Sequence, residues 1–359
     1  MIPIYKPFLN GNEKKYINEC IDSTWISSKG KFVNLFEKAI TDYTGVKYAS
    51  SCSNGSVALD LAFKAIGLKK GDEVITSSFT YVASTNSILI NNGTPVFIDI
   101  ENRSWNLDSS LVESKINKKT KAILISNIYG FLPEINKIRA LCDKYKIFLI
   151  EDAAESLGAD YNGLKSGNIG DISTFSFFGN KTITTGEGGM VMCNDKKFHS
   201  KIEKLKNQGN NEKIRYYHDV LGFNYRMTNI QAAIGLAQME QIKVILSKKR
   251  DIYSHYYNIL GKYVTFQRPL NEKISPSYWI VCVLFKTELQ RQNVINAFKE
   301  KKIEFRPLFF PVDKLPFYKN ADSLDLSNDI YKKGICLPSF PGLSVDELNK
   351  ICKTIKNNL

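Results

Sequence analysis

The segment around Lys181 carries the residues with the clearest chemical potential. Lys181 lies in a Thr- and Gly-rich stretch between two short apolar runs, 172–178 and 190–193. This pattern predicts two strands joined by a turn. A lysine held at such a turn can be partly withdrawn from water, which favours the uncharged amine that attacks a carbonyl to form a Schiff base. A solvated surface lysine would fit the same local pattern.

A second group of reactive side chains follows an apolar strand predicted at 147–150. Glu151 and Asp152 end this strand, and Glu155 comes three residues later. Carboxylates at the C-terminal end of a parallel strand face the crevice where open α/β sheets bind ligands. An aspartate there can hold the protonated pyridine nitrogen of pyridoxal phosphate (PLP). Capping of the next segment is the alternative interpretation of these acids.

Small polar residues at 51–56 precede an apolar-periodic helix at 57–66, which Gly67 should end. Backbone N–H groups at such a helix start can bind a phosphate. Ordinary N-capping gives the same pattern. The segment is neither a Walker loop nor a dinucleotide-binding fingerprint, because the glycine and lysine spacings of those motifs are missing.

A phosphate cradle, a strand-end acid and a loop lysine occur in this order along the chain. Together they resemble the DegT/StrS family of PLP-dependent nucleotide-sugar aminotransferases, and the likeness covers nearly the whole chain. Within that family the resemblance is greatest to the GDP-perosamine synthases. The stretches that carry it are 25–30, 53–59, 80–84, 150–155, 174–190 and 222–229.

The resemblance implies roles around the cofactor ring. Lys181 would bond covalently to PLP, and Asp152 would pair with the pyridine nitrogen. Tyr81 would stack on the ring face, and Glu155 would contact the ring hydroxyl. Without the resemblance, Tyr81 could equally be a core residue of a strand.

The resemblance also implies a phosphate site and a shared active site. Gly55, Ser56 and Ser176 would hold the phosphate, and Asn224 would reach the cofactor of a neighbouring subunit in a homodimer. Ser176 could instead bond to the backbone of its sheet, and Asn224 could be a local helix cap.

The implied reaction moves an amino group from glutamate to a keto nucleotide sugar. The expected substrate is a 4-keto-6-deoxy sugar used for surface polysaccharide, with Lys181 moving the proton. Candidate substrate-binding residues stand in the N-terminal and C-terminal segments that resemble the family. They are Trp25, Ser27, Lys29, Phe310 and Asp313.

The chain departs from the perosamine-synthase pattern at Asn127, Pro276 and Asp313, where histidine is expected. Another keto sugar, or a small keto substrate without a nucleotide, therefore stays open. His218 lies in a family-like run and could be functional or structural. A dehydratase of the same fold would have histidine at the position of Lys181, and a non-catalytic PLP-binding regulator would be expected to lack Lys181 or Asp152.

Composition indicates a large soluble enzyme. The 359 residues carry a net charge of +13, nearly all of it from lysine in short dispersed runs, which argues against a nucleic-acid partner. No apolar run is long enough for a membrane helix, and no signal peptide opens the chain. The seven cysteines are scattered without a C-x-x-C pair, so we expect no metal site and a cytoplasmic location.

Strand-like runs alternate with helical patterns in the first part of the chain, which predicts an α/β fold with a mostly parallel sheet. We predict a large PLP-binding domain over 1–240 and a smaller α+β domain over 241–359. One long helical stretch, 229–257, should connect them. Predicted strands of the large domain are 73–76, 95–100, 122–125 and 147–150, and those of the small domain are 277–285 and 303–306. Other predicted helices are 135–145, 289–301 and 345–356.

Overall fold

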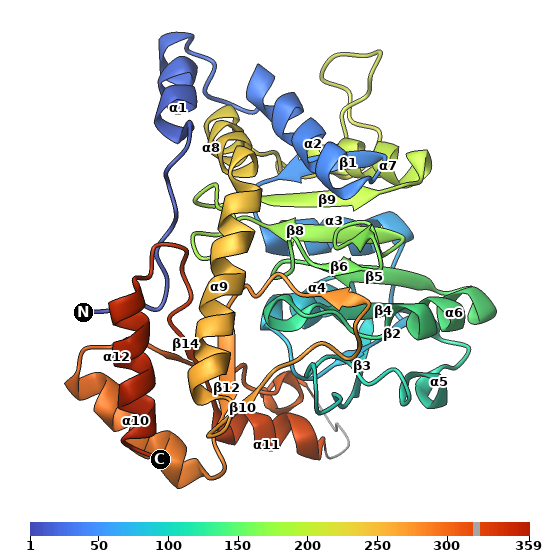
Figure 1. The fold of residues 1–359 in the computed structure, drawn as a ribbon. Coiled ribbons are helices and arrows are strands. Elements are labelled where there is room, and N and C mark those ends of the chain that lie inside the picture. Colours follow the sequence, from blue (N-terminus) through green and yellow to red (C-terminus); the bar gives the residue numbers. More distant parts are fainter. Residues whose placement is uncertain (319–323) are drawn as a thin grey trace.

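The computed structural model describes residues 1–318 and 324–359. Its largest sheet has seven strands in the order β1-β9-β8-β5-β4-β2-β3 (Figure 1). In this sheet only β9 runs against the other strands, so the predicted mostly parallel α/β sheet is confirmed. The strands are β1 (Tyr48–Cys52), β2 (Glu73–Ser77), β3 (Thr94–Ile98), β4 (Thr120–Ser126), β5 (Phe148–Asp152), β8 (Ile172–Ser176) and β9 (Gly189–Cys193).

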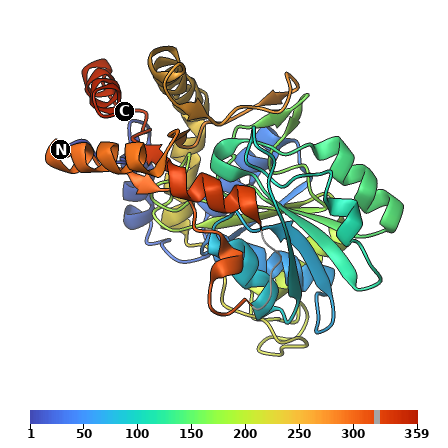
Figure 2. The same ribbon diagram turned by 90° about the horizontal axis from the view of Figure 1, so that it is seen from below.

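Helices cover both faces of this sheet, as the view from below shows (Figure 2). Its strands are apolar almost throughout because both faces are buried. On one face Leu124 and Ile150 pack with α3 and α7, and on the other Leu149 packs with α6 and Phe175 with α2 and α8. The helices around this sheet are α1 (Glu13–Asp22), α2 (Lys31–Thr44), α3 (Gly55–Ile66), α4 (Val82–Ile90), α5 (Val112–Lys115), α6 (Ile135–Tyr145), α7 (Lys196–Lys206) and α8 (Asn229–Glu240).

Local signals set the ends of α3. The Asn54 side chain accepts a hydrogen bond from the Val57 N–H at 3.0 Å, which satisfies an otherwise free donor of the first turn. Gly67 then ends the helix with φ +70°, a left-handed conformation that glycine adopts without strain. These caps fix the start of α3 beside the end of β1.

The predicted helical stretch 229–257 is divided in the structure. α8 ends at Glu240, and α9 (Ile242–Leu260) starts anew after Gln241, whose backbone has φ −98° and ψ 2°. In Figure 1, α9 runs from the large sheet to a second, four-stranded sheet. The prediction of one continuous helix was therefore wrong, because apolar spacing alone does not reveal a one-residue break.

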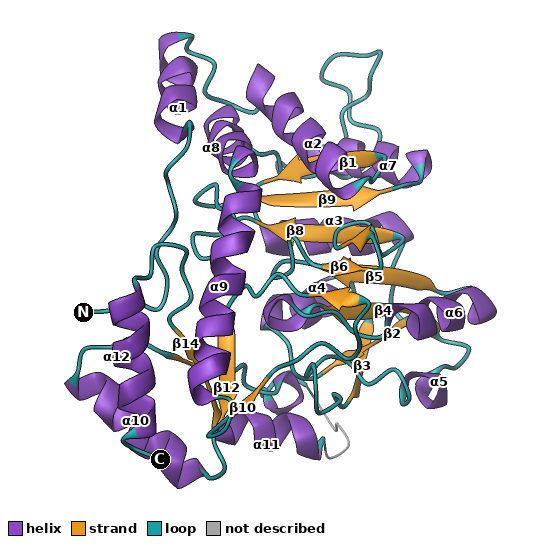
Figure 3. Cartoon of the chain, in the orientation of Figure 1, coloured by secondary structure: helices purple, strands orange, loops and turns teal. Residues whose placement is uncertain are grey.

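The second sheet has the order β10-β12-β14-β13, and all its pairs are antiparallel (Figure 3). Its core also takes in Ile2, which forms a bridge with Ile303, so both ends of the chain lie beside this sheet. The division at residue 240 stays a prediction. The elements here are β10 (Thr265–Phe266), β12 (Val281–Leu284), α10 (Glu288–Glu300), β13 (Arg306–Pro307), α11 (Asp325–Lys333), β14 (Gly334–Leu337) and α12 (Val345–Lys356).

The predicted strand 277–285 is shorter than expected. It is cut to β12 because Tyr278 adopts φ +51°, which a strand cannot contain. Just before it, β11 (Ile274–Ser275) pairs with β6 (Asp160–Tyr161) in a three-stranded sheet completed by β7 (Leu164–Lys165). This pairing brings residues 276–279 to the edge of the large sheet.

Candidate active site

A cavity of about 650 Å³ opens where the parallel strands end. Ser126, Asp152 and Ser176, the last residues of β4, β5 and β8, all line it. The carboxyl ends of parallel strands are the usual ligand-binding edge of an open sheet. Predicted site residues in its wall are Gly55, Ser56, Tyr81, Asp152, Glu155, Ser176 and Lys181.

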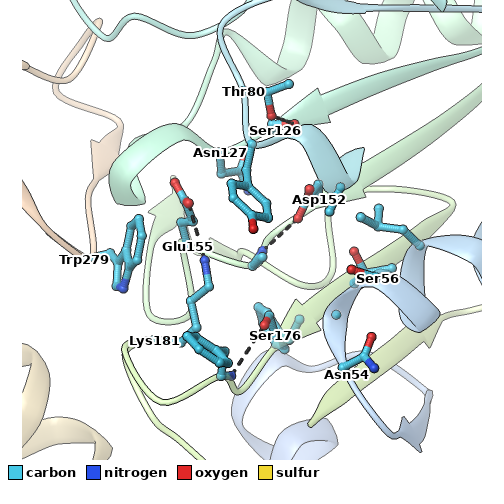
Figure 4. Close-up of a pocket in the computed structure, with 18 of the residues that line it drawn as sticks. Asn54, Ser56, Thr80, Ser126, Asn127, Asp152, Glu155, Ser176, Lys181 and Trp279 are labelled. Atoms are coloured by element: carbon cyan, nitrogen blue, oxygen red, sulfur yellow. Dashed lines mark hydrogen bonds and ion pairs between the residues drawn. The ribbon is translucent and has the colours of Figure 1, made fainter. Parts of the chain in front are cut away.

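Lys181 lies in the turn between β8 and β9, as predicted. Its backbone is held from two sides, because the Lys181 N–H donates to the Phe178 carbonyl at 2.9 Å and the Tyr5 hydroxyl donates to the Lys181 carbonyl at 2.5 Å. The side chain is 13% exposed and reaches into the cavity toward Glu155 (Figure 4). The Lys181 backbone is therefore held in place, and the side-chain amine faces the cavity.

Glu155 is buried and receives two donors. Its Oε1 lies 3.4 Å from the Lys181 Nζ, and its Oε2 accepts from the Tyr129 N–H at 2.9 Å. Burial raises the pKa of the Glu155 carboxyl, while the Lys181 ammonium acts in the opposite direction. The backbone of Tyr129 adopts φ +55°, an unfavourable conformation for a bulky residue, to aim its N–H at this carboxylate.

Asp152 ends β5 with its carboxylate directed into the cavity. Oδ1 accepts from the Ala154 N–H at 3.1 Å, and Oδ2 accepts from the Ser84 hydroxyl at 2.5 Å. Burial raises the pKa of Asp152, and the hydrogen bond from Ser84 is the largest opposing influence. An acid so placed could pair with a protonated ring nitrogen of a ligand.

The start of α3 forms a narrow cradle against the end of β8. A Cβ added to Gly55 would lie 2.7 Å from the Cβ of Ser176, so only glycine allows this close approach. Ser56 lies on the first turn of α3, whose free N–H groups and dipole favour an anion. Gly55, Ser56 and Ser176 could thus hold a phosphate together.

Aromatic side chains form the remaining walls. Tyr81, directly before α4, is 56% exposed, and its ring centroid lies 5.8 Å from that of Phe309. Opposite, the Trp279 ring centroid lies 4.1 Å from the Lys181 Nζ, and the Trp279 indole N–H donates to the Asn180 carbonyl at 2.6 Å. A planar ligand could stack on the free face of Tyr81.

The other predicted residues lie outside this cavity of the single chain. Asn224 is exposed and accepts from Arg226, with Nη2 at 2.8 Å. The remaining predicted residues are Trp25, Ser27 and Lys29, which are exposed before α2; Phe310, which is 46% exposed; and Asp313, which is buried beside Lys314. Trp25 borders a separate hollow of about 490 Å³. The structure does not bring these residues to Lys181 within one subunit.

Two further residues were singled out by the resemblance: Asn127, which departs from the family pattern, and His218, which lies in a family-like run. Asn127 is buried in the cavity wall, and its amide nitrogen donates to Glu151 at 2.8 Å. His218 is exposed, and its Nδ1 lies 2.9 Å from the Gln208 carbonyl oxygen. Neither position decides what the cavity binds.

Sequence reasoning missed Trp279 and Arg306 as cavity residues. Both fell inside predicted strands of the C-terminal part and were taken as strand residues. Nothing local distinguishes them, because β11 and β13 bring them to the cavity only through long-range pairing. The guanidinium of Arg306 could form a bidentate pair with a carboxylate.

Comparison with sequence profiles of known protein families identifies the family of this chain. Residues 7–356 match the profile of the DegT/DnrJ/EryC1/StrS aminotransferase family. The chain belongs to this family. It is therefore a PLP-dependent aminotransferase, as the resemblance predicted.

This chain is similar to other members of the family over nearly its whole length and theirs. GDP-perosamine synthase of Vibrio cholerae is 46% identical over 362 residues, covering 99% of each chain. GDP-perosamine synthase of Escherichia coli O157:H7 is 45% identical over 355 residues, covering 99% of this chain and 97% of the relative. The structure of Helicobacter pylori PseC, an aminotransferase involved in the biosynthesis of pseudoaminic acid, superimposes with a TM-score of 0.95 at 27% identity. That match covers 99% of this chain and 98% of PseC.

The cavity of this aminotransferase fits PLP in three respects. The start of α3 approaches Ser176 closely at Gly55, Asp152 supplies a buried acid, and Lys181 supplies an amine. All three residues line the same cavity. Within the described residues, no helix is long and apolar enough to cross a membrane, and no cluster of His, Cys, Asp or Glu could hold a metal ion.

Proposed function

We propose that this protein transfers an amino group from glutamate to a keto sugar nucleotide, with a GDP-linked 4-keto-6-deoxy sugar as its substrate. The observation that carries this proposal is the 45–46% identity to two GDP-perosamine synthases over nearly complete chains. The aminated sugar would then serve the assembly of a surface polysaccharide.

Lys181 is the proposed covalent attachment point of PLP, with Asp152 against the pyridine nitrogen. Gly55, Ser56 and Ser176 would hold the phosphate, and their close packing supports that role. Tyr81 would cover one ring face with its exposed ring. PLP supplies an electron sink for the carbanion that forms when the substrate loses a proton.

Lys181 is also the proposed acid–base group. Its amine stands in the cavity and can carry a proton between neighbouring atoms once it is free of the cofactor. Glu155, 3.4 Å away, would orient the ammonium form and contact the ring hydroxyl of the cofactor. The Trp279 ring, whose centroid lies 4.1 Å from the Lys181 Nζ, restricts the movement of the amine. One lysine would thus serve as tether and as proton carrier.

The proposed working unit is a homodimer in which Asn224 reaches the cofactor phosphate of the neighbouring subunit. Asn224 is exposed and does not line the cavity of its own chain, which supports a role between subunits. The loop before it exposes large apolar side chains, with Tyr216 81% and Leu221 87% exposed. Such a cluster on a surface loop is typical of a protein–protein contact.

The experiment is a panel of keto sugars with glutamate as amino donor, with the amine product identified by mass spectrometry. GDP- and UDP-linked 4-keto-6-deoxy sugars, a 3-keto sugar nucleotide and a keto sugar without nucleotide form the panel. We expect the GDP-linked 4-keto sugar to give the highest kcat/KM, and Lys181→Ala to give no product. A preference for another member would contradict the substrate assignment and leave the reaction class intact.

Asn127, Pro276 and Asp313 are the positions where this chain departs from the perosamine-synthase pattern. Histidine at these positions could contribute donors to the sugar that this chain lacks. Another keto sugar, or a small keto substrate without nucleotide, is therefore the second candidate, and the panel separates it from the first.

A further inference from the structure

Three hydroxyl groups beside Asp152 form one connected cluster. Thr80 follows β2, Ser84 lies on α4, and Ser126 ends β4. The Ser84 Oγ donates to Asp152 Oδ2 at 2.5 Å. The three hydroxyl oxygens lie 3.2 Å (Thr80–Ser84), 2.9 Å (Thr80–Ser126) and 3.3 Å (Ser84–Ser126) apart, and Thr80, Ser126 and Asp152 are seen together in Figure 4. All three residues are buried; Thr80 and Ser126 line the cavity, whereas Ser84 does not.

The hydrogen bonds of this cluster have a defined direction. An ionised carboxylate only accepts, so the single hydrogen of Ser84 must point to Asp152. The Ser84 oxygen can then only accept from its neighbours. Ser126 donates to Ser84, and Thr80 donates to Ser126. Each bond in such a chain polarises the next one, which strengthens the final bond to the carboxylate.

Ser84 is placed to act on Asp152 and not on a ligand. Its side chain is fully buried, and it is not among the residues that line the cavity. Burial raises the pKa of Asp152, and the Ser84 bond opposes this shift more than the Ala154 N–H or the Lys181 charge does. The Lys181 ammonium is held by Glu155, so it is not directly paired with Asp152.

We propose that Ser84 is a positioning residue that keeps Asp152 ionised and aimed at the pyridine nitrogen of the cofactor, supported by Thr80 and Ser126 as a hydroxyl relay. The inference rests on the role proposed above for Asp152. It does not depend on which keto substrate the enzyme uses.

The test compares Ser84→Ala with the parent enzyme loaded with PLP that is labelled with ¹⁵N in the ring. Without the Ser84 donor, the pKa of Asp152 should rise, so the proton shared with the ring nitrogen should move toward the carboxylate. The ¹⁵N chemical shift should therefore move toward that of neutral pyridine, and the Kd for PLP should rise about tenfold, the size expected for losing a hydrogen bond to a charged group. Neither readout depends on turnover.

Ser87→Ala is the matched control, because Ser87 is a buried hydroxyl on the same helix that donates to the Ser84 carbonyl and not to Asp152. It should leave the ¹⁵N shift unchanged. Thr80→Val, which keeps the side-chain shape and removes the first donor of the relay, should give a smaller shift in the same direction. Ser84→Thr, which keeps the hydroxyl, should restore the parent shift.

Asp152→Asn separates this inference from the proposed function. If Asp152→Asn moves the ¹⁵N shift and neither Ser84→Ala nor Thr80→Val does, the relay is overturned while the role of Asp152 stands. If Asp152→Asn leaves the shift unchanged, the role of Asp152 is wrong and the relay falls with it. If Ser84→Ala does not fold, Thr80→Val decides, and an unchanged shift in that variant overturns the relay.

Discussion

Lys181 and Glu155 form an ion pair inside the cavity, with the Lys181 Nζ 3.4 Å from the Glu155 Oε1. Residues 26 positions apart meet because β5 and β8 are neighbours in the sheet and both end at the cavity. The ion pair holds the Lys181 amine against Glu155 in the cavity wall in the absence of a ligand.

Covalent attachment of the cofactor should occur at Lys181. Borohydride reduction of the PLP-loaded protein should fix the cofactor mass on the peptide that contains Lys181, and Lys181→Ala should fold but show no turnover. Peptide mapping by mass spectrometry checks this. Lys249 is the informative comparison, since it is a fully buried lysine outside the cavity. An adduct on Lys249 or any other lysine would make the central assignment wrong.

Asp152→Asn should lower kcat by about a hundredfold or more, because one preorganised electrostatic group is removed. PLP binding should change much less, since the amide keeps the shape of the side chain. Steady-state kinetics and a PLP titration of the apoprotein measure the two effects. Asp160→Asn, at a carboxylate outside the cavity, serves as the control and should behave like the parent. Near-normal kcat in Asp152→Asn would mean that this acid is only a cap.

Gly55→Ala should weaken PLP binding by about tenfold or more, because the new methyl group would lie 2.7 Å from the Ser176 Cβ and force the cradle apart. Gly179→Ala is the matched control, since an added Cβ there meets nothing within 4 Å. Equilibrium titration of the apoproteins with PLP compares the two variants. Equal affinity in both would show that the phosphate does not sit at the start of α3.

A shared site predicts complementation between subunits. Asn224→Ala and Lys181→Ala should each be impaired as pure proteins. After mixing and refolding, about half of the dimers are mixed, and about a quarter of all sites carry neither lesion. Activity should therefore recover to about a quarter of the parent value. A monomer by light scattering, or no recovery on mixing, would contradict the shared site.

Lys249 should make stability depend on pH. It lies buried on α9, where its Nζ donates to the Trp279 and Ser339 carbonyls, and burial lowers its pKa to about 7. An unfolded lysine keeps its proton to about pH 10.4. Between these values the unfolded chain binds more protons, so the free energy of unfolding should rise with pH, by at most about 1.4 kcal/mol per unit.

The measurement is denaturant unfolding of the parent, Lys249→Met and Lys248→Met between pH 7 and 9. Lys249→Met should lack the part of the slope that Lys249 contributes. Lys248→Met should keep the parent slope, because Lys248 is exposed on the same helix. Equal slopes in all three proteins would contradict a depressed pKa at Lys249.

The local sequence determined much of the large sheet and its site. Continuous apolar runs predicted β2, β4 and β5 close to their observed bounds, and Gly67 ended α3 as expected. The strand–turn–strand around Lys181 is also confirmed. These features are readable because backbone conformation and burial in each segment depend mainly on residues near in sequence.

Only the tertiary structure decided which side chains share the cavity. Trp279 and Arg306 come from segments more than a hundred residues from Asp152, and strand pairing alone brings them there. The sequence assigned no role to the hydroxyls of Thr80, Ser84 and Ser126, which meet beside the Asp152 carboxylate only because β2, α4 and β4 are neighbours in the fold. Contacts of this kind depend on long-range packing and register, because loops and sheet order, and not local periodicity, set the distance between two side chains.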